Sequence, residues 1–132
     1  MNTKIVMTVT SLILGGTGIF LSFAPDIVLN NLSIQVNPTS LLLGQVIGGL
    51  YFGYGLLNWM TKESLIGGIY NRPIATANFT HFLIVGLALS KSLISNQGLP
   101  STLWIACAVY VVLGFLFAII LFRHPINSES QY

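Results

Sequence analysis

The chain has 132 residues, of which 54% are hydrophobic and only 6% are charged, with five Lys or Arg against three Asp or Glu. A soluble domain carries about 25% charged residues, so this composition, with a mean hydropathy of +0.82, excludes a water-soluble globule. Disorder is excluded as well, because it requires low hydrophobicity and high net charge. The few cations are scattered along the sequence, so there is no basic patch that would bind nucleic acid. The length and composition together indicate a membrane protein of one domain.

Four stretches are long and apolar enough to cross a bilayer as helices, which takes about 20 residues each. They cover residues 5–24, 41–60, 74–94 and 102–122. All five prolines fall just beyond these stretches, where helix ends place them. We therefore predict an all-α, polytopic membrane protein in which residues 1–132 form a single antiparallel bundle of four transmembrane helices.

A cleaved signal peptide is the alternative for the first stretch, because Lys4 precedes an apolar run that ends near the small residues Ser22 and Ala24. Signal peptides have apolar regions of about 7–15 residues, whereas this run has full membrane length. Pro25 would also follow the cleavage point directly. An uncleaved anchor is the favoured interpretation.

The distribution of cations predicts that both termini lie in the cytoplasm, where Lys and Arg of short loops are retained. Lys4, Lys62, Arg72 and Arg123 then lie inside, and only Lys91 lies toward the outside. The first loop, residues 25–40, has no cation, and its many apolar residues predict that it lies against the bilayer or caps the bundle. We expect a multi-pass protein of a bacterial cytoplasmic membrane.

Small residues recur along the predicted helices at steps of three and four, the spacing of one helix face. Helices in lipid associate through close packing, which small residues permit. The glycines that we predict to pack between helices are Gly15, Gly18, Gly44, Gly48, Gly55 and Gly114. A second pair with small-xxx-small spacing, Gly49 and Gly53, lies on the second predicted helix.

His81 is the one side chain within a predicted span whose usual titration lies near neutral pH. Asn78 lies one turn before it on the same face. A rise of 1.5 Å per residue places Ser11, Tyr51 and Tyr54 at a similar depth in the inner leaflet, roughly 9–14 Å from that side. Ionisable groups at membrane depth are candidates for function, and hydrogen bonding between helices is the alternative role for this cluster.

Arg72 precedes the third predicted helix, where a guanidinium and free helix N–H groups favour an anion or a lipid headgroup. The alternative is that Arg72 binds no ligand and only helps to orient the chain in the membrane as a cytoplasmic cation. The chain has one cysteine and two histidines, which gives no ligand set for a metal. We expect no metal and no cofactor.

The segment Gly48-Gly49-Leu50-Tyr51-Phe52-Gly53, with the later Arg72-Pro73, Asn78 and His81, resembles small uncharacterised four-helix bacterial membrane proteins of the DoxX-like kind. The resemblance covers about half of the chain. It implies a four-helix membrane bundle, and it carries over no functional residue.

These observations favour a non-enzymatic accessory or structural subunit that packs with itself or with another membrane protein. The bilayer and such a protein are the expected partners, and nucleic acid is not. The alternative is a binder, transporter or enzyme for a small lipophilic molecule that uses the cluster around His81.

Overall fold

The computed structural model describes residues 2–64 and 71–122. These residues form five helices and no strand: α1 (Thr3–Phe23), α2 (Pro25–Asn31), α3 (Pro38–Thr61), α4 (Arg72–Ser95) and α5 (Ser101–Phe122). All except α2 are long and apolar enough to cross a membrane. The predicted all-α fold with four transmembrane helices is confirmed, and the protein is a small multi-pass membrane protein.

The four long helices begin slightly earlier than hydropathy predicts, because polar residues and prolines form their first turns. At the start of α3, the backbone N–H of Ser40 donates to Asn37 Oδ1 at 2.9 Å, and the N–H of Asn37 donates to Ser40 Oγ at 2.9 Å. This reciprocal capping satisfies N–H groups that have no partner within the helix. Pro38 and Pro73 occupy first-turn positions, where the N–H that proline lacks is not needed.

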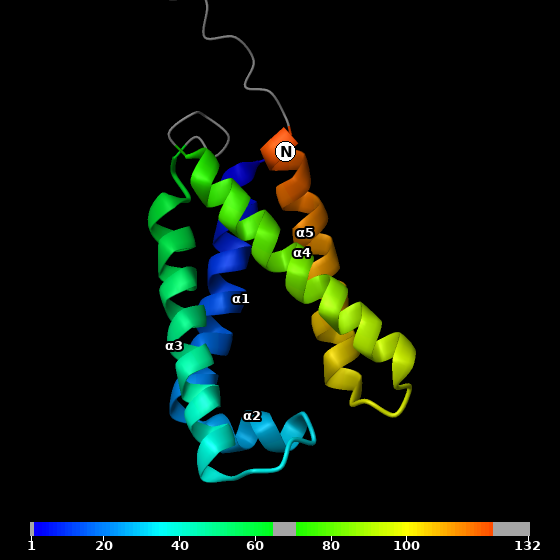
Figure 1. Ribbon diagram of the computed structural model, residues 1–132. Coiled ribbons are helices and arrows are strands. Elements are labelled where there is room, and N and C mark those ends of the chain that lie inside the picture. Colours follow the sequence, from blue (N-terminus) through cyan, green and yellow to red (C-terminus); the bar gives the residue numbers. More distant parts are fainter. Residues whose placement is uncertain (1, 65–70, 123–132) are drawn as a thin grey trace, which may run out of the picture.

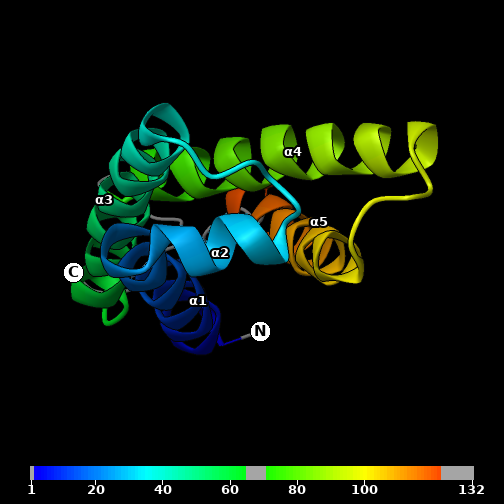
Figure 2. The ribbon, with the colours of Figure 1, turned by 90° about the horizontal axis from the view of Figure 1, so that it is seen from below.

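The long helices associate as two antiparallel pairs (Figure 1). α1 packs mainly on α3, and α4 packs mainly on α5, with fewer contacts between the pairs. α1 begins and α5 ends at the same end of the molecule, here called the terminal end. The pairs lie close together there and diverge toward the opposite end, here called the α2 end, as both views show (Figures 1 and 2).

The loop predicted at residues 25–40 contains a short helix that the sequence analysis did not expect. α2 runs across the α2 end beside α1 and α3 (Figure 2), and it buries Pro25 and Leu29. It stops where Ser33 adopts a φ of 58°, a left-handed conformation that ends a helix. The N–H of Ile34 then donates to the carbonyl of Leu29 at 2.9 Å. Gly44 of α3 makes room for the start of α2, because a Cβ there would lie 3.3 Å from Pro25 Cβ.

The interface between α1 and α3 is a contact of backbone on backbone. A Cβ built on Gly18 would lie 2.8 Å from the Gly48 carbonyl, and one built on Gly48 would lie 2.9 Å from the Gly18 carbonyl. A Cβ on Gly55 would lie 2.7 Å from Gly15 Cα, although one on Gly15 itself would meet nothing within 4 Å. Glycine therefore sets the separation of these two helices.

The pair of α4 and α5 packs less closely. A Cβ on Gly114 would lie 3.6 Å from Phe82 Cβ, which is ordinary van der Waals contact. The rings of Phe82 and Phe117 stack with centroids 5.7 Å apart, and both side chains are fully buried. Side chains, more than glycines, therefore fill this interface.

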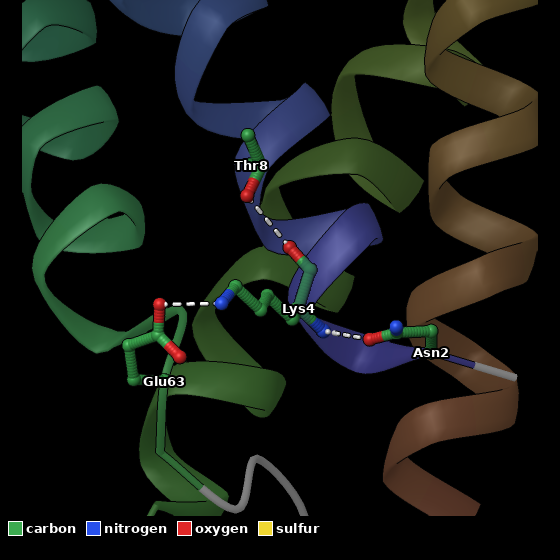
Figure 3. Close-up of polar contacts among 4 residues, drawn as sticks. All are labelled: Asn2, Lys4, Thr8 and Glu63. Carbon is green, nitrogen blue, oxygen red and sulfur yellow. Dashed lines mark hydrogen bonds and ion pairs between the residues drawn. The ribbon is translucent and has the colours of Figure 1, made fainter.

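An ion pair joins α1 to the segment after α3 at the terminal end (Figure 3). Lys4 Nζ lies 2.8 Å from Glu63 Oε1, and both side chains are more than half exposed. The hydrogen bond from Lys4 lowers the pKa of the Glu63 carboxyl below its usual value. Exposed ion pairs contribute little to stability, so this contact adds little to the packing of α1 on α3.

Candidate functional site

His81 lies where α3, α4 and α5 meet, surrounded by aromatic rings. Its ring centroid lies 5.6 Å from Tyr51 and 5.4 Å from Tyr54 on α3, and 5.6 Å from Tyr110 on α5. Phe82, its neighbour on α4, lies at 5.2 Å. We call Tyr51, Tyr54 and Tyr110 the tyrosine cage.

One hydrogen bond closes the tyrosine cage. The hydroxyl of Tyr110 donates to the hydroxyl of Tyr51 at 2.7 Å, joining the two helix pairs. His81 Nε2 is buried beside these rings and has no hydrogen-bond partner among the described residues. An imidazole nitrogen is a strong donor or acceptor, so this atom is free to bind another group.

The structure brings together only part of the cluster that the sequence suggested. Tyr51 and Tyr54 both contact His81. Ser11 instead donates its hydroxyl to the carbonyl of Gly55 at 2.8 Å, within the interface of α1 and α3. Asn78 is fully buried, and its amide nitrogen donates to the carbonyl of Ile74 at 2.9 Å, on its own helix.

Three further residues were missed by the sequence reasoning. Tyr110 completes the tyrosine cage, whereas Thr10 and Asn58 are fully buried polar residues nearer the terminal end. The hydropathy pattern around Thr10 does not show which way its side chain faces. Asn58 and Tyr110 occur at the small and polar spacing of their helices, so that signal could have found both.

Four buried polar atoms lack a hydrogen-bond partner among the described residues: Thr10 Oγ1, Asn58 Oδ1, Asn78 Oδ1 and His81 Nε2. We call these four residues the polar layer. An unsatisfied buried polar group costs about 1–3 kcal/mol, and folded proteins contain few of them. In a membrane-spanning chain no bulk water relieves this cost, so the polar layer is a candidate for function.

An apolar groove of about 280 Å³ lies along the surface between α4 and α5. Phe82 and Tyr110 line it and also contact His81, so the groove adjoins the aromatic surroundings of that residue. At one end Ser90 Oγ contacts Cys107 Sγ at 3.3 Å. Apolar walls beside a few convergent polar groups are typical of small-molecule sites.

The predicted anion site is less well defined. Arg72 is the exposed first residue of α4, and its carbonyl accepts a hydrogen bond from Thr76 Oγ1 at 2.9 Å. Residues 65–70, which precede it in the sequence, lie outside the described residues. Among residues 2–64 and 71–122, no three His, Cys, Asp or Glu side chains gather as a metal site.

No family model, curated protein or solved structure matches this chain. The resemblance to DoxX-like proteins therefore stays a prediction, and the argument for function rests on the site itself.

Proposed function

We propose that the protein binds a small lipophilic molecule within the bilayer, in a bacterial cytoplasmic membrane, with His81 contacting its polar part. The observation that carries the proposal is the set of buried polar atoms without partners in the polar layer. A bound ligand would supply the missing hydrogen bonds. A purely structural role explains these residues less well, because residues that hold helices together would be hydrogen-bonded to neighbouring helices.

The surroundings of His81 favour a ligand with an apolar body. Four aromatic rings lie within 5.6 Å of the His81 ring, centroid to centroid. Aromatic side chains offer a large apolar surface, and tyrosine adds a polar hydroxyl at its edge. The adjoining groove between α4 and α5 is lined mainly by apolar side chains and extends this surface.

We propose binding and not catalysis. The described members of the polar layer and the tyrosine cage include no carboxylate, no cysteine and no metal site. His81 Nε2, the candidate general base, has no hydrogen bond to a hydroxyl among the described residues, whereas a nucleophile and its base normally lie within hydrogen-bond reach of each other.

The test is to identify what the protein carries from its membrane. The full chain is expressed in bacteria, extracted into nanodiscs with native lipid, and denatured for mass spectrometry of the released small molecules. We expect one molecule enriched over bulk lipid in the wild type and lost from His81→Ala. Ile84→Ala, a change at an exposed position of the same helix that does not line the groove, is the matched control and should retain the molecule.

The proposal is wrong if the wild type enriches nothing over bulk lipid, or if folded His81→Ala retains the molecule. Should His81→Ala fail to fold, His81→Phe replaces it, because phenylalanine keeps the ring contacts and removes only the nitrogens. Circular dichroism and thermal melting establish folding of each variant.

An accessory or structural subunit is the second candidate, favoured by an exposed face of α3 that carries one glutamine and two glycines. Gln45, Gly49 and Gly53 are exposed, and a Cβ on either glycine would meet nothing within 4 Å. Steps of four place the three residues on one face, and a glutamine at membrane depth normally bonds another helix. A second copy or another membrane protein bound there would satisfy it.

Native mass spectrometry of intact nanodiscs tests this role. We expect a stoichiometric complex that dissociates in Gln45→Leu. Monomeric wild type, or a complex unaffected by that substitution, would remove this second candidate and leave the first.

A further inference from the structure

We infer that the groove between α4 and α5 holds one acyl chain of an anionic phospholipid, whose phosphate group pairs with Lys91. The lipid belongs to the leaflet at the α2 end, which is the outer leaflet in the predicted orientation. This site goes beyond the proposed function, because His81 does not line the groove. The lipid is therefore additional to the molecule that His81 contacts.

The groove has the shape of a site for a hydrocarbon chain. Its floor includes two buried glycines, Gly86 of α4 and Gly114 of α5, which have no side chain to fill the space between the helices. Large apolar side chains that are exposed, among them Leu87 and Phe115, also line it. A buried floor of glycine beside exposed apolar side chains leaves a channel that is open to the lipid.

The length of the groove matches one leaflet of a bilayer. Along α4 it extends from Phe79 to Ser90, and 11 residues at 1.5 Å each give roughly 16 Å. The hydrocarbon of one leaflet is about 15 Å thick, half of the usual core of about 30 Å. A transmembrane helix of a partner would need a contact along the whole core, so this groove fits a lipid chain better than a helix.

Lys91 lies beside one end of the groove. It follows Ser90 directly and lies one helical turn after Leu87, and both of these residues line the groove. Residues four apart are neighbours on the surface of a helix, so Lys91 continues the row of Leu87. Its side chain is exposed and forms no ion pair with a described residue.

The depth of Lys91 is that of a lipid phosphate group. α4 has 24 residues and ends at Ser95, at the α2 end (Figure 1). Its length of about 36 Å exceeds the hydrocarbon core by about 3 Å at each end. Lys91 lies four residues, roughly 6 Å, before the end of the helix. Its long side chain therefore reaches the boundary between hydrocarbon and headgroups, where lysines near helix ends place their ammonium group.

The charge of this region favours an anionic lipid. No Asp or Glu occurs between Glu63 and Glu129 in the sequence, so α4, α5 and the loop that joins them carry no acid. Their charged residues are Arg72, at the opposite end of α4, and Lys91. A cation near the membrane surface attracts anionic lipids. A zwitterionic lipid carries its own cation, which competes with Lys91 for the phosphate.

Native mass spectrometry of the full chain in detergent micelles tests the pairing with Lys91. The probes are dioleoyl phosphatidylglycerol and dioleoyl phosphatidylcholine, which share their acyl chains and differ in net charge. We expect the wild type to bind phosphatidylglycerol more tightly, and Lys91→Gln to reduce this preference about fivefold. Lys62→Gln removes a cation near the terminal end and is the matched control that should retain the preference.

Two neighbouring valines of α5 provide a matched test of the groove. Val111 and Val112 are 51% and 58% exposed, but of the two only Val111 lines the groove. Val111→Trp should fill the groove and abolish the preferential binding of phosphatidylglycerol, whereas Val112→Trp should leave it unchanged. Circular dichroism establishes folding. If Val111→Trp fails to fold, Leu87→Trp replaces it, because Leu87 lines the groove from an exposed position.

Equal affinity of the wild type for the two lipids, or a preference that persists in Lys91→Gln or in folded Val111→Trp, overturns the inference. A dimer of the wild type that is lost in Val111→Trp would show that a second copy occupies the groove, and it would overturn the inference as well. The proposed function is tested separately, because Lys91→Gln should retain the molecule that His81→Ala loses.

Discussion

Replacing Gly55 by alanine is expected to destabilise the protein, because α1 and α3 meet there through their backbones. A Cβ on Gly55 would lie 2.6 Å from Gly15 N, 2.7 Å from Gly15 Cα and 3.1 Å from the Ser11 carbonyl oxygen. Non-bonded carbon atoms pack at about 3.5–4.0 Å, so the α1 backbone must move away by about 1 Å. The same movement stretches the hydrogen bond of 2.8 Å from Ser11 to Gly55.

The magnitude follows from two opposing effects. Inserting a methyl group into a packed interface costs about 1–3 kcal/mol, whereas alanine is favoured over glycine within a helix by about 1 kcal/mol. Gly53 lies two residues away on the same helix, and a Cβ there would meet nothing within 4 Å. Gly53→Ala therefore retains the favourable effect alone. Because that effect is common to both variants, their free energies of unfolding should differ by the packing cost alone, about 1–3 kcal/mol.

Equilibrium unfolding in mixed micelles, followed by circular dichroism as sodium dodecyl sulfate is added, measures this difference. Because both variants exchange the same two residue types on one helix, effects on the unfolded state largely cancel. If Gly55→Ala is as stable as Gly53→Ala, then α1 and α3 do not make the backbone contact described above.

Three further predictions concern orientation, the tyrosine cage and the ion pair. In a variant whose native cysteine is replaced by serine, an impermeant thiol reagent added outside intact cells should label Asn37→Cys and not Ser64→Cys. The reverse labelling pattern would mean that the predicted orientation is wrong. A double-mutant cycle of Tyr51→Phe and Tyr110→Phe should give a coupling energy of about 0.6 kcal/mol, the average for hydrogen bonds between helices in membranes. A coupling energy of zero would mean that the two hydroxyl groups do not form a hydrogen bond. The ion pair with Lys4 lowers the pKa of Glu63, so its contribution to stability should persist at neutral pH and be lost as acidification protonates the carboxyl. Glu63→Gln should therefore remove this small acid dependence of the thermal melting temperature.

The sequence by itself determined the class of the protein and the lengths of its spans. Apolar runs of membrane length, with few charges and with proline at their ends, can be satisfied only as helices, because a helix bonds its backbone internally in lipid. Depth along each helix was also readable, since the rise per residue is constant. His81 and the two cage residues Tyr51 and Tyr54 were therefore placed together correctly.

Only the tertiary structure decided which helices pair and what each polar side chain meets. Ser11 has the right depth for the site but donates to the carbonyl of Gly55. Thr10, its neighbour in sequence, has a buried hydroxyl oxygen without a hydrogen-bond partner among the described residues. A difference of one residue turns a side chain by about 100° around a helix. Which direction leads to a neighbouring helix depends on how glycines such as Gly18 and Gly48 bring α1 and α3 together. That packing joins residues far apart in the chain, so local sequence fixes the depth of a side chain in the membrane but not its partner.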